Sequence, residues 1–222
     1  MAKNVVPQNL KIFHILHILH ILHIDRLESI INDKFLYCDE IIHNRFNGGT
    51  NIGMNHIKER RLNVFLSSYS DLTVGKCVPF YFCPRSVMLY VIKCGNHPDI
   101  AYCGGQENVI HLEFDMKKVL NWASANNKRC VFTTSSAGSY YFEDYKDFSC
   151  LDKINWNAIN ARQWQDVKED KQAEFLIESE LSWGLLERIG VHNLSIYQKV
   201  STMLNKLNVN KPVIEIKQDW YY

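Results

Sequence analysis

Lys171-Gln172-Ala173-Glu174-Phe175-Leu176-Ile177 is the stretch that decides the fold, because it places one carboxylate between a polar turn and an apolar strand. A carboxylate held at the start of a buried strand can accept a hydrogen bond from a sugar hydroxyl and stabilise positive charge beside it. The same position also suits a buried structural acid, which needs a cationic partner such as Arg162 or Lys171. From this stretch alone, both interpretations of Glu174 stay open.

The size and charge of the chain limit its organisation and its partners. With 222 residues, of which 46% are hydrophobic and 22% charged, the chain can bury one substantial core, and we expect a single domain over residues 1–222. Its formal net charge of +1 is too small to attract a polyanion as a whole. A nucleic acid would therefore be held by a local cluster of cations, for which the sequence offers Lys58, Arg60, Arg61 and Arg85.

The cysteines and the apolar N-terminal segment bear on where the protein works. The seven cysteines include no C-x-x-C pair and leave an odd thiol, so neither a zinc knuckle nor a complete disulfide framework is indicated. The apolar run 10–24 is interrupted by histidines, is too short to span a bilayer and lacks a small-residue cleavage site. We therefore expect a cytoplasmic protein with no membrane or export signal.

A repeat near the N-terminus has an unusual period. The run His14-Ile15-Leu16-His17-Ile18-Leu19-His20-Ile21-Leu22-His23 repeats every three residues, whereas a strand has a period of about two and a helix of about 3.6. The sequence therefore leaves its secondary structure open. The histidines imitate a metal stripe, but a tripeptide duplication explains their spacing, and no carboxylate or cysteine recurs beside them. We expect no metal site.

Hydrophobic periodicity and turn residues predict the elements outside that repeat. We expect a helix over residues 25–32 that is capped by Asp25, a loop over 44–55 and a helical turn over 56–62. Strands are predicted at 78–82, 88–93, 109–114, 129–134, 173–177, 185–191 and 212–216, and further helices at 116–125 and 196–207. Because these short strands do not alternate regularly with helices, the pattern is typical of an α+β fold. The lack of a G-x-G-x-x-G or Walker A sequence argues against Rossmann and P-loop enzymes.

Several short motifs occur along the chain in one order. They are Ile21-Leu22-His23-Ile24-Asp25, Glu59-Arg60-Arg61, the segment 78–90, Gly104-Gly105-Gln106-Glu107, Gln172-Ala173-Glu174-Phe175-Leu176 and Asp219-Trp220-Tyr221-Tyr222. Together they resemble the DarT family, the toxins of the DarT–DarG toxin–antitoxin pair, over nearly the whole chain. The resemblance implies an α+β ADP-ribosyltransferase-like split β-sheet core with peripheral helices. It also implies NAD+ as co-substrate, single-stranded DNA as substrate and a macrodomain antitoxin as partner, and Tyr81-Phe82-Cys83-Pro84-Arg85-Ser86 is similar to the thymidine-modifying branch.

Two residues carry the chemistry that the resemblance implies. The catalytic glutamate of the family falls on Glu174 and its essential arginine on Arg61. Breaking the bond between ribose and nicotinamide concentrates positive charge on the sugar, and Glu174 is expected to stabilise that charge without a metal ion. The thymine acceptor must lose a proton. Because arginine is a poor base, we expect Arg61 to stabilise the deprotonated base through paired N–H donors rather than to abstract the proton.

The resemblance assigns the NAD+-binding first strand to the end of the histidine repeat. Anchoring that strand on His23-Ile24-Asp25 makes His20 the histidine that contacts NAD+, followed by Ile21 and Leu22. Extra His-Ile-Leu units precede the anchor, so His14 is the alternative to His20. Leu22 stands where the family has a threonine, and Lys34 stands where it has a glycine near the end of the next helix. We expect His20 to position the cofactor rather than to transfer a proton.

Four further residues are candidates for contact with DNA. Arg60 and Arg85 could bind phosphates, although Arg60 could also belong to a solvated helix face and Arg85 could support a loop. Tyr140 and Tyr141 lie in a loop upstream of the catalytic strand and could stack on unpaired bases. Strand alternation sends about half of the aromatic residues 80–82 into the core, so the sequence does not choose a stacking partner among them. We expect the terminal aromatic residues 220–222 to cover the core.

The sequence leaves other activities open. Guanine, RNA or a protein side chain could occupy a similarly shaped acceptor site. A catalytically silent module that binds NAD+ or nucleic acid is also conceivable, because the His-Ile-Leu region and Leu22 depart from the family pattern.

Overall fold

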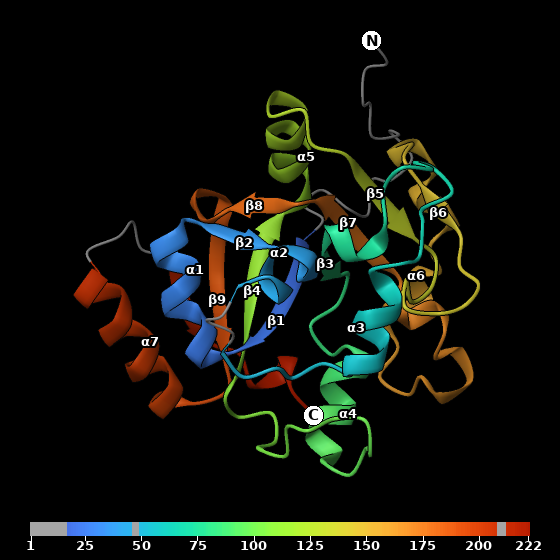
Figure 1. Cartoon of the computed structure of the whole chain (residues 1–222). Coiled ribbons are helices and arrows are strands. Elements are labelled where there is room, and N and C mark those ends of the chain that lie inside the picture. The colour runs from blue at the N-terminus through green and yellow to red at the C-terminus, as the bar shows by residue number, and fades with distance from the viewer. Residues whose placement is uncertain (1–16, 46–48, 208–211) are drawn as a thin grey trace.

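The computed structural model describes residues 17–45, 49–207 and 212–222, and in Figure 1 the described part forms a sheet with helices around it. Its strands are β1 (His17–His23), β2 (Phe35–Tyr37), β3 (Cys77–Tyr81), β4 (Val109–Asp115), β5 (Cys130–Thr133), β6 (Asp144–Tyr145), β7 (Glu174–Glu178), β8 (Glu180–Ser182), β9 (Leu186–Val191) and β10 (Val213–Ile216). Its α-helices are α1 (Leu27–Asp33), α2 (Asp39–His43), α3 (Asn55–Arg61), α4 (Val87–Cys94), α5 (Met116–Ala125), α6 (Trp156–Asn160) and α7 (Leu194–Leu207).

The strands form one large sheet and one small one. In the described residues the large sheet has the order β10-β9-β4-β1-β3-β7-β5-β6, and β2 pairs with β8 separately. Neighbouring strands are antiparallel except β9 and β10, which are parallel. The predicted α+β class is therefore confirmed. The prediction of a single domain over residues 1–222 also concerns residues outside the described ranges, and it stays a prediction.

The centre of the large sheet brings the repeat strand and the glutamate strand together. Strand β1 lies between β4 and β3, and its isoleucines and leucines are buried on both faces while its histidines are partly exposed. A central strand that is covered on both faces needs no alternation of polar and apolar residues, which explains why the repeat lacks a period of two. Strand β3 then pairs with β7 so that Tyr81 lies beside Glu174. Strands β1 and β7, which are about 150 residues apart in the sequence, thus lie on either side of β3.

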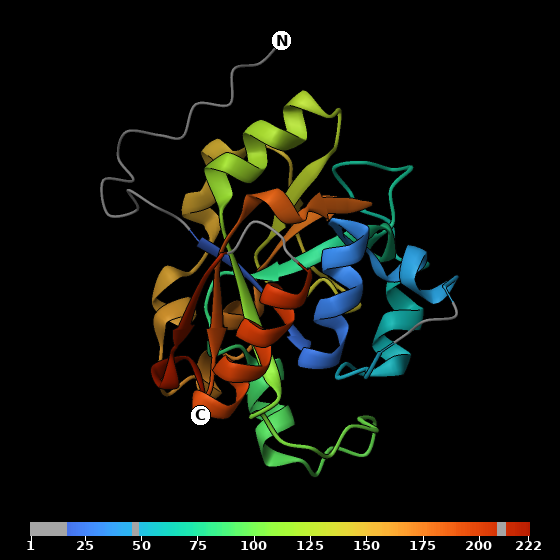
Figure 2. The same cartoon turned by 90° about the vertical axis from the view of Figure 1, so that its left-hand side faces the viewer.

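Phenylalanine rings hold this central region in place. Phe80 on β3 makes edge-to-face contacts with Phe114 on β4 and Phe175 on β7, with ring centroids 5.5 Å and 6.0 Å apart. All three side chains are almost completely buried, and each such burial stabilises the fold by roughly 1.5–3 kcal/mol. Helices α1 and α7 lie side by side over one face of the sheet (Figure 2). The strand carrying Glu174 is therefore fixed by core packing.

One predicted strand is wrong. The β-branched and aromatic residues at 88–93 predict a strand, but they form helix α4. The helix begins where the Ser86 side chain accepts a hydrogen bond from the Leu89 amide, and it ends at Gly95, which adopts the left-handed conformation with φ of 64°. Capping residues at both ends outweigh the β-propensity of the apolar run between them.

The first predicted helix is confirmed, but its predicted cap is wrong. Helix α1 begins at Leu27, its N-cap is Arg26, and Asp25 lies in a short 3-10 turn before it. The carboxylate of Asp25 accepts hydrogen bonds from Thr50 instead of from the helix. At the other end, Lys34 has a φ of 62°, a conformation that favours glycine, which agrees with the expected glycine position. The short elements β2, α2 and β8 were not predicted.

The terminal aromatic residues cover the core as expected. Tyr221 is only 4% exposed, and its hydroxyl donates to the carbonyl of Val109 at 2.8 Å. The Trp220 ring lies against Gly190, where an added Cβ would come within 2.5 Å of it. Trp220 and Tyr221 thus pack against the sheet at β4 and β9.

Candidate active site

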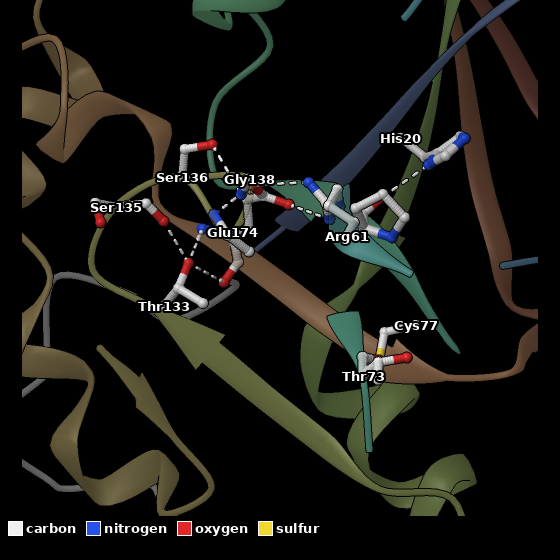
Figure 3. Close-up of polar contacts among 11 residues, drawn as sticks. His20, Arg61, Thr73, Cys77, Thr133, Ser135, Ser136, Gly138 and Glu174 are labelled. Atoms are coloured by element: carbon white, nitrogen blue, oxygen red, sulfur yellow. Dashed lines mark hydrogen bonds and ion pairs between the residues drawn. The ribbon is translucent and has the colours of Figure 1, made fainter. Parts of the chain in front are cut away.

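Glu174 and Arg61 form a buried ion pair at the start of β7 (Figure 3). Arg61, near the end of α3, donates from Nη2 to Oε2 of Glu174 at 2.8 Å and from Nη1 to Oε1 at 3.2 Å. The two side chains are 10% and 4% exposed. Although burial opposes it, the neighbouring Glu174 raises the pKa of Arg61 above its usual range, so the guanidinium stays charged. The structure thus joins the two residues that the sequence singled out.

Other contacts fix the position of the Glu174 carboxylate. Oε1 also accepts a hydrogen bond from the amide of Ala137 at 2.9 Å. The amide of Glu174 itself donates to Oγ1 of Thr133 at 3.0 Å, and that hydroxyl donates to the carbonyl of Ser135 (Figure 3). Oε1 therefore has two donors, whereas the described residues give Oε2 only Arg61. An ionised carboxylate oxygen can accept two hydrogen bonds, so Oε2 has capacity for another donor.

The structural pairing considered for Glu174 is wrong. Lys171 is almost completely buried, and its Nζ donates to the carbonyl of Ile159 at 2.7 Å. Arg162 lies on the surface. The partner of Glu174 is Arg61, from a helix more than a hundred positions earlier in the chain.

The ion pair forms part of the wall of a cavity of about 470 Å³. That volume lies within the usual range of roughly 300–1,000 Å³ for small-molecule and cofactor sites. The predicted cofactor positions all line it, and so do polar residues from several other segments: His20, Ile21, Leu22, Arg26, Asp39, Lys58, Arg60, Arg61, Tyr81, Gln172 and Glu174. The alternative histidine, His14, lies outside the described residues.

One ring nitrogen of His20 is hydrogen-bonded to the neighbouring strand β3, and this contact sets the protonation of both ring nitrogens. Nδ1 lies 2.8 Å from the carbonyl oxygen of Pro79, which can only accept, so Nδ1 carries the proton (Figure 3). Burial lowers the pKa of His20 from 6.5 to about 4, and the ring is neutral near pH 7. Nε2 is consequently a hydrogen-bond acceptor. This geometry suits the positioning role predicted for His20.

A second ion pair on the cavity wall was not predicted. Asp39, at the start of α2, accepts a hydrogen bond from Nζ of Lys58 at 2.8 Å. Lys58 and Arg61 are three residues apart on α3 and share one face. Burial opposes ionisation of Asp39, but Lys58 and Arg61 lower its pKa below the ordinary value. The sequence carries no motif for Asp39, because its role depends on an ion pair between α2 and α3, which only the fold brings together.

The structure selects one aromatic residue from the segment 80–82. Phe80 and Phe82 are buried in the core, whereas Tyr81 lines the cavity. In the register of the sheet Tyr81 is directly beside Glu174. Burial raises the pKa of Tyr81, so its hydroxyl stays protonated. Strand alternation alone could not make this choice.

The four candidate DNA contacts lie in two places. Arg60 donates to the carbonyl of Gly138, and its guanidinium carbon lies 4.5 Å from the centre of the Tyr140 ring. Tyr140 and Tyr141 are 82% and 93% exposed. Arg85, in contrast, stacks on the ring of Tyr222 at 4.3 Å and does not line the cavity. The structure therefore brings Lys58, Arg60 and Arg61 together but leaves Arg85 outside that cluster.

Comparison with known proteins places this geometry in a family. Residues 19–222 match the family model of the single-stranded DNA thymidine ADP-ribosyltransferase DarT. The chain belongs to the DarT family. It is 34% identical over 173 residues to a DNA ADP-ribosyl transferase of Thermus aquaticus, a match that covers 78% of this chain and 75% of that protein. The predicted family, fold and enzyme class are confirmed.

Solved DarT structures from Thermus sp. 2.9 are similar along their whole length. The complex with ADP-ribosylated single-stranded DNA has a TM-score of 0.83 and 29% sequence identity, and the match covers 100% of both chains. The complex with NAD+ has a TM-score of 0.78 and 27% identity, covering 98% of this chain and 100% of that one. The NAD+ and the modified DNA are bound in those Thermus structures.

Two expectations of absence concern the described ranges only. Among those residues, no group of three or more histidine, cysteine or acidic side chains has the arrangement of a metal site. His17, His20 and His23 of the repeat lie on β1 within this part of the chain, whereas His14 does not. None of the described helices is both long and apolar enough to cross a bilayer.

Proposed function

We propose that this DarT family member transfers ADP-ribose from NAD+ to a thymidine base of single-stranded DNA and releases nicotinamide. The observation that carries the proposal is the buried Glu174–Arg61 pair on the wall of a cavity of about 470 Å³. The family match supports the reaction, and the Thermus structures with NAD+ and with ADP-ribosylated DNA support both substrates.

Glu174 is the residue that stabilises the transition state. As the bond to nicotinamide breaks, positive charge develops on the ribose, and a fixed, desolvated carboxylate beside the sugar stabilises that charge. Oε1 is held by Arg61 and Ala137, so Oε2 is the oxygen that accepts a hydrogen bond from a ribose hydroxyl. Nicotinamide leaves as a neutral molecule, and the step needs no metal ion.

Arg61 orients Glu174 and stabilises the acceptor base. Its raised pKa excludes proton abstraction by the guanidinium near neutral pH. One edge of the planar fork binds Glu174, and the remaining N–H groups can donate to a thymine oxygen that gains negative charge as N3 loses its proton. The role is electrostatic, and it requires the fork geometry.

The NAD+ site lies along β1. His20 accepts a hydrogen bond at Nε2 and holds the cofactor in position, because its Nδ1 proton is already bound to Pro79. Ile21 and Leu22 line the same cavity. Leu22 has no hydroxyl, so any polar contact made by the family threonine falls to other groups here. Tyr81, beside Glu174, supplies an aromatic face for the nicotinamide ring.

The DNA strand enters beside the loop that contains Tyr140 and Tyr141. Exposed aromatic rings bind unpaired bases by stacking, and Arg60 holds the Tyr140 ring through a cation–π contact. Arg60 supplies local positive charge in a chain whose net charge is only +1, whereas the charge of Lys58 is balanced by Asp39. Arg85 contributes less, because its guanidinium is stacked on Tyr222.

The family context also suggests a partner and a compartment. The sequence resembles toxins that are paired with a macrodomain antitoxin, and such a partner would remove the adduct from DNA. Both proposed substrates, NAD+ and single-stranded DNA, are present in the bacterial cytoplasm, where the seven free cysteines would stay reduced.

The test uses two oligonucleotides that differ at one position. The purified chain is incubated with NAD+ and either a single-stranded oligonucleotide containing one thymidine or the same strand with cytidine there. We expect an ADP-ribose adduct only on the first strand, mapped to the thymidine, with nicotinamide released in equal amount. Modification of guanine, RNA or protein instead would redirect the proposal to that acceptor. Binding of NAD+ without nicotinamide release, even with DNA present, would support the silent binding module.

A further inference from the structure

Asp25 is the acidic residue of the His-Ile-Asp motif, and its contacts point away from the helix that it was expected to cap. Its Oδ2 accepts hydrogen bonds from the Thr50 hydroxyl at 2.6 Å and from the Thr50 amide at 3.1 Å. Nδ1 of His23 lies 3.0 Å from Oδ1 on the other side of the carboxylate. A residue of the β1–α1 corner is thus bound to a segment 25 positions away.

Arg26 binds the same segment through its backbone carbonyls. Its Nε donates to the carbonyl of Thr50 and its Nη2 to the carbonyl of Gly49, both at 2.9 Å. The amide, hydroxyl and carbonyl of Thr50 are therefore all engaged by two adjacent residues. We call this set of contacts, made by Asp25 and Arg26 to Gly49 and Thr50, the Thr50 clamp.

Gly49 permits the close approach that the clamp needs. A Cβ at position 49 would lie 2.8 Å from Cγ of Arg26 and 2.8 Å from Oδ1 of Asp25. Both distances are shorter than normal van der Waals contact, so a side chain there would push the two segments apart. The glycine is explained by this contact without any functional role of its own.

The clamped segment forms one wall of the cavity. Residues 50–54 all line it, and they lead directly into α3, which carries Lys58 and Arg61. Figure 1 shows this segment running from the start of α1 toward α3. Asp25 itself is not among the residues that line the cavity. It can therefore act on a ligand only through the segment that it holds.

We propose that Asp25 is a positioning residue that fixes the wall segment 50–54 and thereby sets the affinity for NAD+. This inference rests on the proposed function for the identity of the ligand. Although partial burial opposes it, hydrogen bonds from Thr50 and His23 hold the pKa of Asp25 below its ordinary value, so the clamp is charged near neutral pH. Hydrogen bonds to an ionised acceptor are roughly twice as strong as neutral ones.

The clamp should act on binding rather than on the chemical step. Arg61 is held separately by Glu174, and Lys58 by Asp39, so α3 keeps two anchors when the clamp is broken. Loosening the wall segment removes preorganised contacts to NAD+ without moving the reacting groups. A change in KM for NAD+ with kcat preserved distinguishes this role from general loss of structure.

The experiment compares three variants of the full chain. Asp25→Asn removes the charge, Thr50→Val removes the hydroxyl donor, and Thr50→Ser keeps that donor as a conservative rescue. For the first two we expect about tenfold weaker binding of NAD+ and an equal rise in its KM, with kcat within about twofold, because one charge-assisted hydrogen bond is lost. Thr50→Ser should bind NAD+ like the wild type.

Hydrogen exchange gives a readout that does not require activity. The Thr50 amide should exchange faster in Asp25→Asn, while the Ala137 amide, which donates to Glu174, should keep its protection. Asp71→Asn is the matched control, since Asp71 is another carboxylate that accepts hydrogen bonds, from Arg129, and neither Asp71 nor Arg129 lines the cavity. Unchanged NAD+ affinity in both Asp25→Asn and Thr50→Val would overturn the inference. A wild-type chain that binds no NAD+ would contradict the proposed function instead, and faster exchange at Thr50 would still support the clamp.

Discussion

Strand β7 carries a carboxylate–arginine pair at each end, and both pairs are bidentate. At the first residue, Glu174 binds the fork of Arg61 at 2.8 Å and 3.2 Å. At the last residue, Glu178 binds Nη2 and Nε of Arg129 at 2.7 Å and 3.0 Å. By the geometry of the ion pair alone, neither end would be chosen as the active site.

The surroundings separate the two pairs. Glu174 is 4% exposed and forms part of a cavity wall, whereas Glu178 is 21% exposed and does not line that cavity. Oε2 of Glu178 accepts from both the backbone amide and the side chain of Arg129, and Arg129 also binds Asp71. In contrast, Oε2 of Glu174 keeps acceptor capacity toward the cavity. Desolvation, an adjacent cavity and a remaining lone pair make a carboxylate available for chemistry.

The largest expected difference between the two ends of β7 comes from neutralising each carboxylate in turn. Glu174→Gln should lower kcat for nicotinamide release and for DNA modification by about 10³-fold or more, because the amide cannot stabilise positive charge on the sugar. Glu178→Gln should change kcat by less than about twofold, because Glu178 does not line the cavity in which the reaction takes place. Rates measured at saturating NAD+ and DNA check both values. Equal losses in the two variants would mean that β7 only needs both pairs for its structure.

Replacement of the arginines tests whether the fork matters at one end only. Arg61→Lys keeps the charge but cannot bind Glu174 and the acceptor base with one planar group, so we expect kcat to fall by about 10²-fold. Arg129→Lys should stay within about threefold of the wild type, because its site is a surface site. A pH–rate profile of each variant completes the measurement. Normal activity of Arg61→Lys would exclude any role that needs the fork.

The same comparison shows what the sequence could predict. The change from polar to apolar residues at the start of its strand drew attention to Glu174 but left its role open, and the family resemblance made Glu174 and Arg61 the catalytic candidates. Glu178, in the same strand, carries no local signal that sets it apart from Glu174. The difference depends on which end of β7 lies at the cavity, and that cavity is lined in part by α2 and α3, which are far away in the sequence.

Local rules failed where distant contacts or short signals decide the structure. The run 88–93 has the composition of a strand, but Ser86 and Gly95 cap it as helix α4. Asp25 is a residue type that often caps a helix, but its carboxylate instead accepts hydrogen bonds from the amide and the hydroxyl of Thr50. Asp39 and the cavity-facing side of Tyr81 follow from tertiary packing, for which a single sequence has no pattern. Long amphipathic elements such as α5, in contrast, were predicted with their observed bounds.

A smaller effect is expected from the exposed aromatic loop. The double variant Tyr140→Ala and Tyr141→Ala should raise KM for single-stranded DNA by about tenfold, since stacking of one base contributes roughly 1–3 kcal/mol. Affinity for NAD+ should not change, because neither ring lines the cavity. Fluorescence anisotropy with a labelled oligonucleotide and calorimetry with NAD+ separate the two ligands. Weaker NAD+ binding in this variant would contradict the separation of the two ligands and show that the loop contributes to the cavity at Glu174.

The smallest effect concerns pH, because the burial that isolates the Glu174 end of β7 also keeps His20 neutral. With a pKa lowered to about 4, His20 should contribute less than about a twofold change in kcat/KM for NAD+ over roughly pH 6 to 8. Below that range activity should fall as Nε2 gains a proton and stops accepting hydrogen bonds. A titration near pH 6.5 that disappears in His20→Asn would contradict this assignment.

Stability should respond to pH before activity does. Unfolded histidine takes up a proton near pH 6.5, whereas His20 and His111 in the folded chain do so only near pH 4. The unfolded state therefore binds more protons between these values, and the free energy of unfolding must fall as the pH drops from 6.5 toward 4. His111 packs against Tyr221 and does not line the cavity. His111→Gln should consequently reduce the acid dependence of the melting temperature and leave the pH dependence of kcat/KM unchanged, which separates the contribution of a buried histidine to stability from its contribution to the site.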